Sequence, residues 1–484
     1  MKHSPEYLLG ITVLPEYFQV EGASQVLANC VDIGHANAIT TSPYVMRQVE
    51  KNEFGLGQRE PPIDAGAGDV RLLDRPLWGK RELYVETAPA FSPSKTLYRG
   101  LKYQPPSETA LTKDQQHHIH EALELSNKKG VLTYMQVQAA IPPGYRVQFS
   151  VSDPNDQPLM PNLRQVQDRV AANASLACRD VLDYHCALVV DLCDQYPSLT
   201  GIRVDWPEYP PYRLDSVFLD FSHAVETYCH DRDGFSYSAI RQNIATFYDD
   251  LHGRGKPVIT DSLLQNILDA SNPWEMLADR FSHYGIPEWL QLKQGIVFNY
   301  ISKLREALDS HGHQDKQLVP HAFPPPFNIM SGLGFDRIAP LADHIAVKLY
   351  TMHWAMIARF YLDQLFECNP QVDESLLVAA IFKLLQISDD PAPANIAEVR
   401  YPSPSEPHFS SERVQHEKIE FAQKSAGETP IAALVHGYGP VEDTIRRVTN
   451  GLEVSNNRIW INRYGYLSDE KIAKLGELFQ THIQ

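Results

Sequence analysis

The chain has 484 residues, 43% of them hydrophobic, and its 60 acidic and 43 basic side chains give a formal net charge of −17. This composition predicts a soluble globular protein, and the negative charge disfavours nucleic acid and acidic membrane surfaces as partners. The first residues, MKHSPEYLLGITVLPEYF, are too polar for a signal peptide, and no stretch approaches the ~20 apolar residues of a membrane span. Six cysteines give no disulfide framework, so we expect a cytoplasmic location.

Eight short runs with β-strand character alternate with helical segments along the whole chain. The strand-like runs cover residues 7–14, 36–41, 131–139, 200–205, 317–323, 344–350, 430–436 and 458–463. One long helical run between them, 165–196, is amphipathic and ends at a proline. The alternation predicts an α/β protein with a parallel sheet, and eight strands are the number that closes a (β/α)8 TIM barrel.

Two segments exceed the ~250 residues of a minimal barrel. Residues 50–112 are rich in glycine, proline and aromatic residues and have weak periodicity, which predicts a loop-rich insertion after the second strand. Residues 231–316 have helical character and separate the fourth strand from the fifth. We expect one elaborated barrel over residues 1–484, with a distinct helical subdomain at the second insertion as the alternative. The oligomeric state is open, with a homo-oligomer among the alternatives.

The segment 201–212, GIRVDWPEYPPY, places two carboxylates where a strand stops. Apolar and polar residues alternate up to Asp205, and the prolines that follow end the strand there. Glu208 therefore lies in the loop directly after the strand. Active sites of βα barrels are built at the carboxyl ends of their strands. The position of both carboxylates therefore indicates an enzyme.

Carbohydrate chemistry explains a pair of carboxylates at this position. Glycosidic cleavage needs one carboxyl group to protonate the leaving oxygen and a second carboxylate to attack carbon or activate water. We predict Asp205 as nucleophile or base and either Glu208 or Glu16, at the end of the first strand, as proton donor. The structural alternative is that Asp205 forms a salt bridge with Arg203 or Arg213, while the two glutamates are exposed loop residues.

The other strand ends carry polar and aromatic residues that suit a polyhydroxylated ligand. Aromatic faces stack on the C–H surfaces of sugars, while amides and charged groups bind hydroxyl groups. The expected partner is thus a small-molecule or oligosaccharide substrate. The predicted substrate-binding residues are Trp206, Tyr209, Tyr17, Gln138, His321, Lys348, Tyr350, His353, His436, Tyr438, Arg463 and Tyr464.

Two rival functions use the same barrel. Lys348 lies on the sixth strand, where burial would free its amine for the Schiff-base chemistry of a class I aldolase or lyase. Its simpler role is a charge anchor for Asp205 or for substrate hydroxyl groups. The second rival is a carbohydrate-binding protein without turnover. We expect no cofactor and no metal, because no nucleotide fingerprint lies at a strand-to-helix turn, the HExxH spacing is absent, and His117, His118 and His120 fall on a predicted surface helix.

The run of about forty residues from 173 to 212, which ends with CRDVLDYHCALVVDLCDQYPSLTGIRVDWPEYPPY, resembles a segment of (β/α)8 glycoside-hydrolase-like proteins. In that superfamily, which includes amylase-type and fucosidase-type barrels, a helix leads into a strand that ends on an acidic residue and an aromatic-proline loop. The resemblance implies that Asp205 takes the catalytic position at the fourth strand end, with Glu208 as its neighbour. The chain departs from the pattern at the later strand ends, where histidines and Lys348 stand instead of a second carboxylate.

Overall fold

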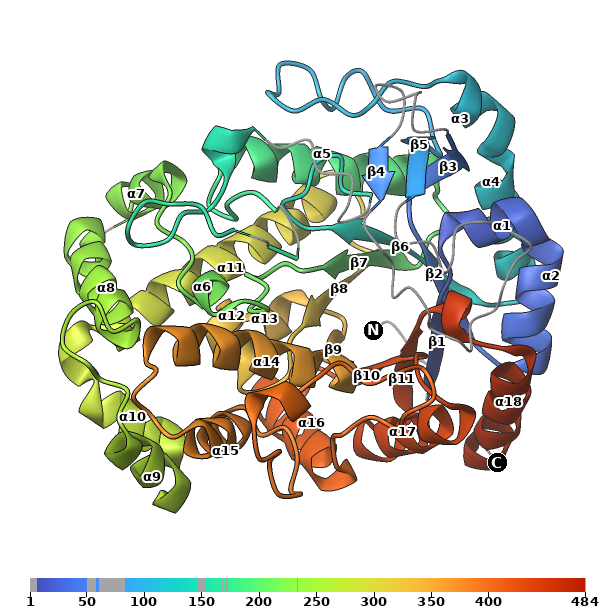
Figure 1. Cartoon of the computed structure of the whole chain (residues 1–484). Coiled ribbons are helices and arrows are strands. Elements are labelled where there is room, and N and C mark those ends of the chain that lie inside the picture. The colour runs from blue at the N-terminus through green and yellow to red at the C-terminus, as the bar shows by residue number, and fades with distance from the viewer. Residues whose placement is uncertain are drawn as a thin grey trace.

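A closed barrel of eight parallel strands forms the centre of the protein (Figure 1). The computed structural model describes residues 7–49, 58–60, 83–145, 153–167, 169–170, 173–232 and 234–483. The barrel strands are β1 (Leu8–Thr12), β2 (Ala38–Thr41), β6 (Leu132–Gln138), β7 (Gly201–Asp205), β8 (Gln317–Ala322), β9 (Ile345–Leu349), β10 (Ile431–His436) and β11 (Arg458–Asn462). Each lies within one of the eight predicted runs, so the predicted TIM barrel is confirmed.

The barrel closes through β1, which pairs in parallel with β2 on one side and with β11 on the other. In this register Ile11 lies beside Ile39 of β2 and Ile461 of β11. Going round the barrel, every strand neighbours the next barrel strand in the sequence. Because all the strands are parallel, their carboxyl ends meet at one end of the barrel, where loops assemble a site.

Side chains fill the inside of the barrel, which makes it a packed core and not a pore. Gly10 lies so close to Trp460 that a Cβ atom would be 2.1 Å from the indole ring. The ring of Trp460 thus fills the inside of the barrel next to Gly10. The apolar cluster that spans the strands consists of Leu8, Ala38, Tyr134, Val319, Ala346, Ala432, Leu434 and Trp460.

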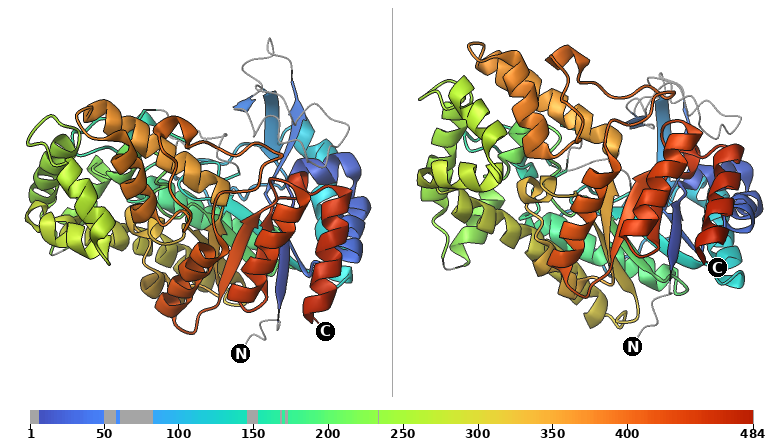
Figure 2. Two further views of the ribbon diagram at one scale, coloured as in Figure 1. Left: turned by 60° about the horizontal axis from the view of Figure 1, so that its bottom comes forward. Right: turned by 90° about the horizontal axis from the view of Figure 1, so that it is seen from below.

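Helices surround the barrel and cover the outer faces of its strands (Figures 1 and 2). Those between barrel strands up to β7 are α1 (Pro15–Glu21), α2 (Ala23–Leu27), the π-helix η1 (Ala28–Ile33), α3 (Ala110–Gln115), α4 (His117–Lys128) and α5 (Arg179–Gln195). Those after β8 are α12 (Phe327–Ser331), α13 (Phe335–Ile338), α14 (Thr351–Cys368), α15 (Glu374–Leu385), α16 (Glu412–Ala426), α17 (Val441–Val454) and α18 (Asp469–Ile483).

The helix predicted over 165–196 is shorter in the structure, because α5 begins only at Arg179. The backbone just before it bonds to other loops instead of to itself. The Ala174 amide donates to the Ala140 carbonyl at 2.7 Å, and the Ser175 amide donates to the Asp156 carbonyl at 2.7 Å. These long-range hydrogen bonds replace the local ones that a helix would need.

A small antiparallel sheet lies between β2 and β6 in the sequence, with strand order β3-β5-β4. Its strands are β3 (Tyr44–Gln48), β4 (Gln58–Glu60) and β5 (Leu83–Pro89). Figure 2 shows this sheet projecting at the end of the molecule opposite to the N-terminus. Residues 50–57 and 61–82 of the predicted loop-rich insertion lie outside the described residues.

The chain between β7 and β8 forms helices, which gather with α15 at one side of the barrel (Figure 1). Helix α9 packs against α15, while α11 packs against α5 beside the barrel. Within the described ranges, no helix combines the length and apolar character needed to cross a membrane. The helices of this segment are α6 (Leu214–Val217), α7 (His223–His230), α8 (Tyr237–Leu251), α9 (Asp261–Asp269), α10 (Pro273–Arg280) and α11 (Ile286–Ser310).

Candidate active site

Side chains of three neighbouring strands meet at the carboxyl end of the barrel. The Oδ1 atom of Asp205, at the end of β7, lies 3.0 Å from His321 Nδ1 on β8 and 2.9 Å from Lys348 Nζ on β9. The rings of Phe323 and Trp206 have their centroids 4.6 and 5.5 Å from the same Nζ atom. The side chain of Asp205 is 17% exposed, against 2% for each of its two partners. The carboxylate is therefore the most accessible part of this cluster.

Charge and burial set the protonation states of the cluster. Burial acts to raise the pKa of Asp205, but the charge of Lys348 and the contact with His321 outweigh it and hold that pKa well below its usual range. Burial, with the charge of Arg203, lowers the pKa of His321 to about 4, so the imidazole is neutral at pH 7. An ionised carboxylate only accepts hydrogen bonds, so the proton of His321 is assigned to Nδ1. Its Nε2 atom is then an acceptor, and the described residues offer it no hydrogen bond.

A buried arginine lies deeper in the barrel than Asp205. Arg203 stacks on Trp460, with Cζ 3.8 Å from the ring centroid, and its Nη1 donates to Thr12 Oγ1 at 3.3 Å. Burial lowers the pKa of Arg203 to about 10, which leaves the guanidinium charged at pH 7. Sequence reasoning considered Arg203 only as a salt-bridge partner of Asp205. Its alternation in phase with Asp205 along β7 is the signal that places it inside the barrel.

The loop after β7 turns at Trp206 and buries Glu208. Trp206 has φ 54°, a left-handed conformation that is uncommon for residues other than glycine. The carboxylate of Glu208 is 0% exposed, and it accepts hydrogen bonds from the Phe323 amide at 2.8 Å and the Ser331 hydroxyl at 2.5 Å. Burial raises the pKa of Glu208 to about 7, against the opposing effect of Lys348. Glu208 is thus not an exposed loop residue, and it fastens the β7 loop to the segment after β8.

Five rings from the loop after β9, the first turn of α14, the end of β10 with its loop and the segment before α16 form one aromatic cluster. Tyr350 makes edge-to-face contacts with His353 and His436, with ring centroids 5.5 and 5.2 Å apart. Tyr401 lies 6.1 Å from His353 and 5.3 Å from Tyr438. The structure therefore brings four predicted substrate-binding residues together. Tyr401 was not predicted from the sequence, because this residue lies in an irregular segment with no periodic pattern.

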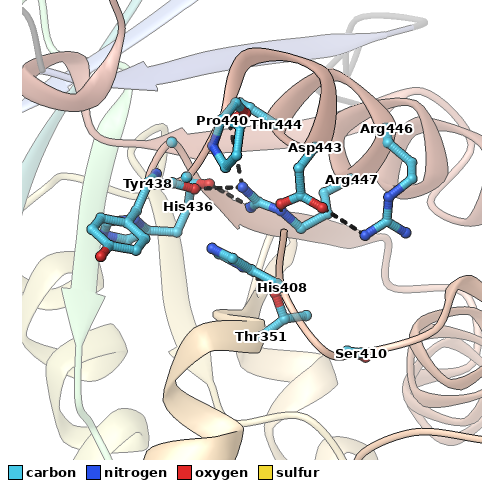
Figure 3. Close-up of polar contacts among 12 residues, drawn as sticks. Thr351, His408, Ser410, His436, Tyr438, Pro440, Asp443, Thr444, Arg446 and Arg447 are labelled. Atoms are coloured by element: carbon cyan, nitrogen blue, oxygen red, sulfur yellow. Dashed lines mark hydrogen bonds and ion pairs between the residues drawn. The ribbon is translucent and has the colours of Figure 1, made fainter. Parts of the chain in front are cut away.

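Two buried cations fix the loop that carries His436 and Tyr438. Arg447 donates to the carbonyl groups of these two residues at 2.6 and 2.5 Å, and its Nε donates to Asp443 Oδ2 at 2.8 Å (Figure 3). Lys471 donates to the carbonyl groups of Gly437 and Gly439, which follow these two residues, at 3.0 and 2.7 Å. Four consecutive carbonyl groups are thus held by two buried side chains. The two rings are held in place before any ligand binds.

The predicted residues near β1 form a separate group. Glu16 accepts a hydrogen bond from the Tyr44 hydroxyl at 3.1 Å and is 3% exposed, so the alternative of an exposed loop residue is wrong. Tyr17 packs edge-to-face on Tyr464, with ring centroids 5.1 Å apart. The hydroxyl of Tyr464 donates to Glu21 at 2.5 Å, which directs it towards the end of α1.

Three further predicted residues have other neighbours. Tyr209 is 0% exposed and its hydroxyl donates to Asp220 Oδ2 at 3.1 Å, in a buried network apart from the aromatic cluster. Gln138, at the end of β6, is 5% exposed, and its amide oxygen has no hydrogen-bond partner among the described residues. Arg463 donates to the Tyr466 hydroxyl at 3.3 Å beside the β10 loop.

The groups at the end of the barrel can transfer protons and stabilise charge. They comprise an ionised carboxylate, a carboxyl group that titrates near pH 7, a neutral imidazole and an ammonium group. In the described part of the chain, no set of three or more histidine, cysteine, aspartate or glutamate side chains is arranged to hold a metal ion.

Comparisons with known proteins relate this chain to glycoside hydrolases through its fold. No model of a known protein family matches the chain, and no curated protein matches it. The catalytic domain of β-amylase from Paenibacillus polymyxa superposes with a TM-score of 0.50 at 8% identity, over 99% of this chain and 98% of that domain. A β-galactosidase from the psychrophilic Marinomonas ef1 gives a TM-score of 0.48 at 10% identity. It is covered over 59% of its own length and 98% of this chain.

A third structure, α-L-fucosidase isoenzyme 2 from Paenibacillus thiaminolyticus, gives a TM-score of 0.43 at 11% identity, over 99% of this chain and 48% of the fucosidase. The chain thus spans about half to three fifths of the length of the fucosidase and the β-galactosidase. At these identities the likeness concerns the fold. The predicted resemblance is confirmed at that level, and the chain is a (β/α)8 barrel of glycoside-hydrolase-like fold.

Proposed function

We propose that this protein is a glycoside hydrolase that binds its sugar at the carboxyl end of the barrel. Asp205 acts as the ionised carboxylate and Glu208 as the proton donor. The observation that carries the proposal is that the pKa values of two carboxyl groups only three residues apart in the sequence are shifted in opposite directions. The pKa of Asp205 is held well below its usual range, and the pKa of Glu208 is raised to about 7. Such a separation is how one site keeps one carboxylate charged and the other protonated.

The hydrogen bonds of Asp205 favour one of its oxygens for the reaction. Oδ1 is occupied by Lys348 and His321, whereas among the described residues Oδ2 has a hydrogen bond only from the Gln136 amide, at 3.5 Å. Oδ2 is therefore the oxygen that attacks the anomeric carbon or takes a proton from water. Lys348 keeps the carboxylate ionised, because protonating it would break the ion pair at 2.9 Å.

Glu208 has two alternative roles, proton donor and positioning residue. Because its side chain is buried, an experiment must distinguish between them. As proton donor it would assist the departure of the leaving oxygen; as a positioning residue it would only tie the β7 loop to Phe323 and Ser331. The identity of the leaving group separates these roles. A poor leaving group needs protonation, whereas a dinitrophenolate leaves without it.

The test is hydrolysis of oligosaccharides and of dinitrophenyl glycosides by the wild type and by three carboxylate-to-amide variants. Asp205→Asn should slow both substrates by at least about a hundredfold. Glu208→Gln should slow the oligosaccharides by about 10²- to 10⁴-fold and leave the dinitrophenyl glycosides nearly unchanged. Glu16→Gln tests the alternative donor, because Glu16 is also buried, in the first turn of α1, where it binds Tyr44.

Full turnover by Asp205→Asn would refute the assignment of Asp205. Equal losses on both substrates in Glu208→Gln would make Glu208 a positioning residue, and a loss on oligosaccharides alone in Glu16→Gln would make Glu16 the donor. Ligand binding without product would favour the carbohydrate-binding protein.

A Schiff-base mechanism needs Lys348 as a free amine, whereas its Nζ lies 2.9 Å from Asp205. A substrate adduct trapped by borohydride would nevertheless establish it. A cytoplasmic location, a homo-oligomeric state and the division into one elaborated barrel remain predictions from the sequence.

A further inference from the structure

A cavity of about 450 Å³ opens beside the aromatic cluster and is lined in part by α14. Its volume lies within the ~300–1,000 Å³ range of small-molecule sites. The wall is formed by α14, by the segment that precedes α16 and by the β10 loop. The lining residues are Met356, Arg359, Phe360, Val399, Arg400, Tyr401 and Tyr438.

Ring contacts link the lining of the cavity to the candidate active site. Tyr401 and Tyr438 line the cavity and also touch each other, with centroids 5.3 Å apart. His353 lies 6.1 Å from Tyr401 and 6.4 Å from His436, and Tyr350 lies 5.2 Å from His436. A series of rings thus leads from the end of β9, next to Lys348, into the cavity.

The charges of the cavity are already neutralised by the protein. Arg359 binds both oxygens of Asp363 at 2.8 Å, and Arg400 binds both oxygens of Glu406 at 2.6 and 2.7 Å. Neither guanidinium group therefore requires an anionic ligand. The remaining lining is aromatic and apolar, with a few peptide groups, which suits the faces and hydroxyl groups of a neutral sugar.

The cavity is also formed in advance. The carbonyl group of Tyr438 is held by Arg447 (Figure 3), and the Tyr438 hydroxyl donates to the Pro402 carbonyl at 2.9 Å, which joins the two loops of the wall. Gly439 beside it has φ +104°, and a Cβ there would lie 3.1 Å from His408 Nε2. A wall that is already ordered loses little entropy when a ligand binds.

We infer that this cavity binds the sugar units beyond the one attacked, so that the substrate is a neutral oligosaccharide and not a single glycoside. The inference rests on the proposed function for the place of cleavage, but binding in the cavity needs no turnover. Tyr401, Tyr438 and Phe360 supply the stacking faces. An acidic oligosaccharide should gain nothing from the cavity, because both of its arginines are paired.

The experiment is calorimetric titration of Asp205→Asn with malto-, cello- and chito-oligosaccharides from the monosaccharide to the hexasaccharide, and with oligogalacturonides as acidic probes. Affinity should rise with length for at least one neutral series and not for the acidic one. Tyr401→Ala should weaken the binding of long chains about fivefold, since one aromatic contact contributes ~1 kcal/mol, and leave monosaccharide binding unchanged.

Two further variants distinguish a specific loss of binding in the cavity from misfolding of the protein. Met356→Trp fills the cavity from the rigid α14 helix and should give the same selective loss. Phe421→Ala removes an exposed ring on α16, 52% accessible, and should change nothing. Affinity that is independent of length, losses that affect all lengths equally, or no binding by any neutral series would overturn the inference. Length-dependent binding without hydrolysis by the wild type would instead overturn the proposed function and leave the cavity site standing.

Discussion

Replacing Arg447 by methionine should destabilise the protein far more than the same change at the neighbouring Arg446. Both guanidinium groups bind the carboxylate of Asp443, Arg447 at 2.8 Å and Arg446 at 2.7 Å. Their environments differ, because the side chain of Arg447 is 1% exposed and that of Arg446 is 35% exposed. The two variants thus compare a buried and a partly exposed ion pair on one carboxylate.

The loss in free energy of unfolding depends on which polar groups each substitution leaves without a partner. Arg447→Met removes the buried partner of Asp443 and the donors to the carbonyl groups of His436 and Tyr438, which lie 2.6 and 2.5 Å away. Breaking a buried pair of this kind costs about 3–5 kcal/mol. Arg446→Met should cost about 1 kcal/mol or less, because water can replace a partly exposed partner.

Urea unfolding followed by tryptophan fluorescence and near-ultraviolet circular dichroism measures both free energies. The m-values must agree between the variants for the midpoints to be compared. Similar losses in the two variants would refute the argument that burial determines the contribution of each arginine. Arg447→Met should also weaken oligosaccharide binding, because the β10 loop loses part of its support.

Three further outcomes follow from the structure. Lys348→Met should move the acid limb of the pH–rate profile to higher pH, because the pKa of Asp205 rises without its ion pair at 2.9 Å. An unchanged acid limb would show that Lys348 does not hold the carboxylate ionised. Folding raises the pKa of Glu208 from 4.5 to about 7. As the pH rises through that interval, the wild type should lose up to about 3 kcal/mol of stability relative to Glu208→Gln, with no loss below it. Parallel curves of stability against pH for the two proteins would contradict this. Gly10→Ala should cost about 1–3 kcal/mol, because the new Cβ would lie 2.1 Å from the Trp460 ring, and Trp460→Phe in the same chain should recover part of that cost; strictly additive effects would exclude the clash.

The sequence by itself determined the barrel and the end of it at which the candidate site lies. Strands buried on both faces appear as continuous apolar runs, and β10, IAALVH, is buried throughout. The alternation of Arg203 and Asp205 also depends only on the two-residue period of a strand, so the inward direction of Asp205 follows from the sequence. These features are local, and a local pattern is sufficient to predict them.

Only the tertiary structure decided which of the strand-end residues meet. Glu208 is buried because its partners Phe323 and Ser331 lie 115 and 123 positions away in the chain. Tyr209, the next residue, turns instead to Asp220, and Tyr464 turns to Glu21. Beyond the end of a strand no period fixes the direction of a side chain, so loop conformation and long-range hydrogen bonds determine it. For the same reason no pattern along the chain indicates Tyr401, whose contacts with His353 and Tyr438 come from folding alone.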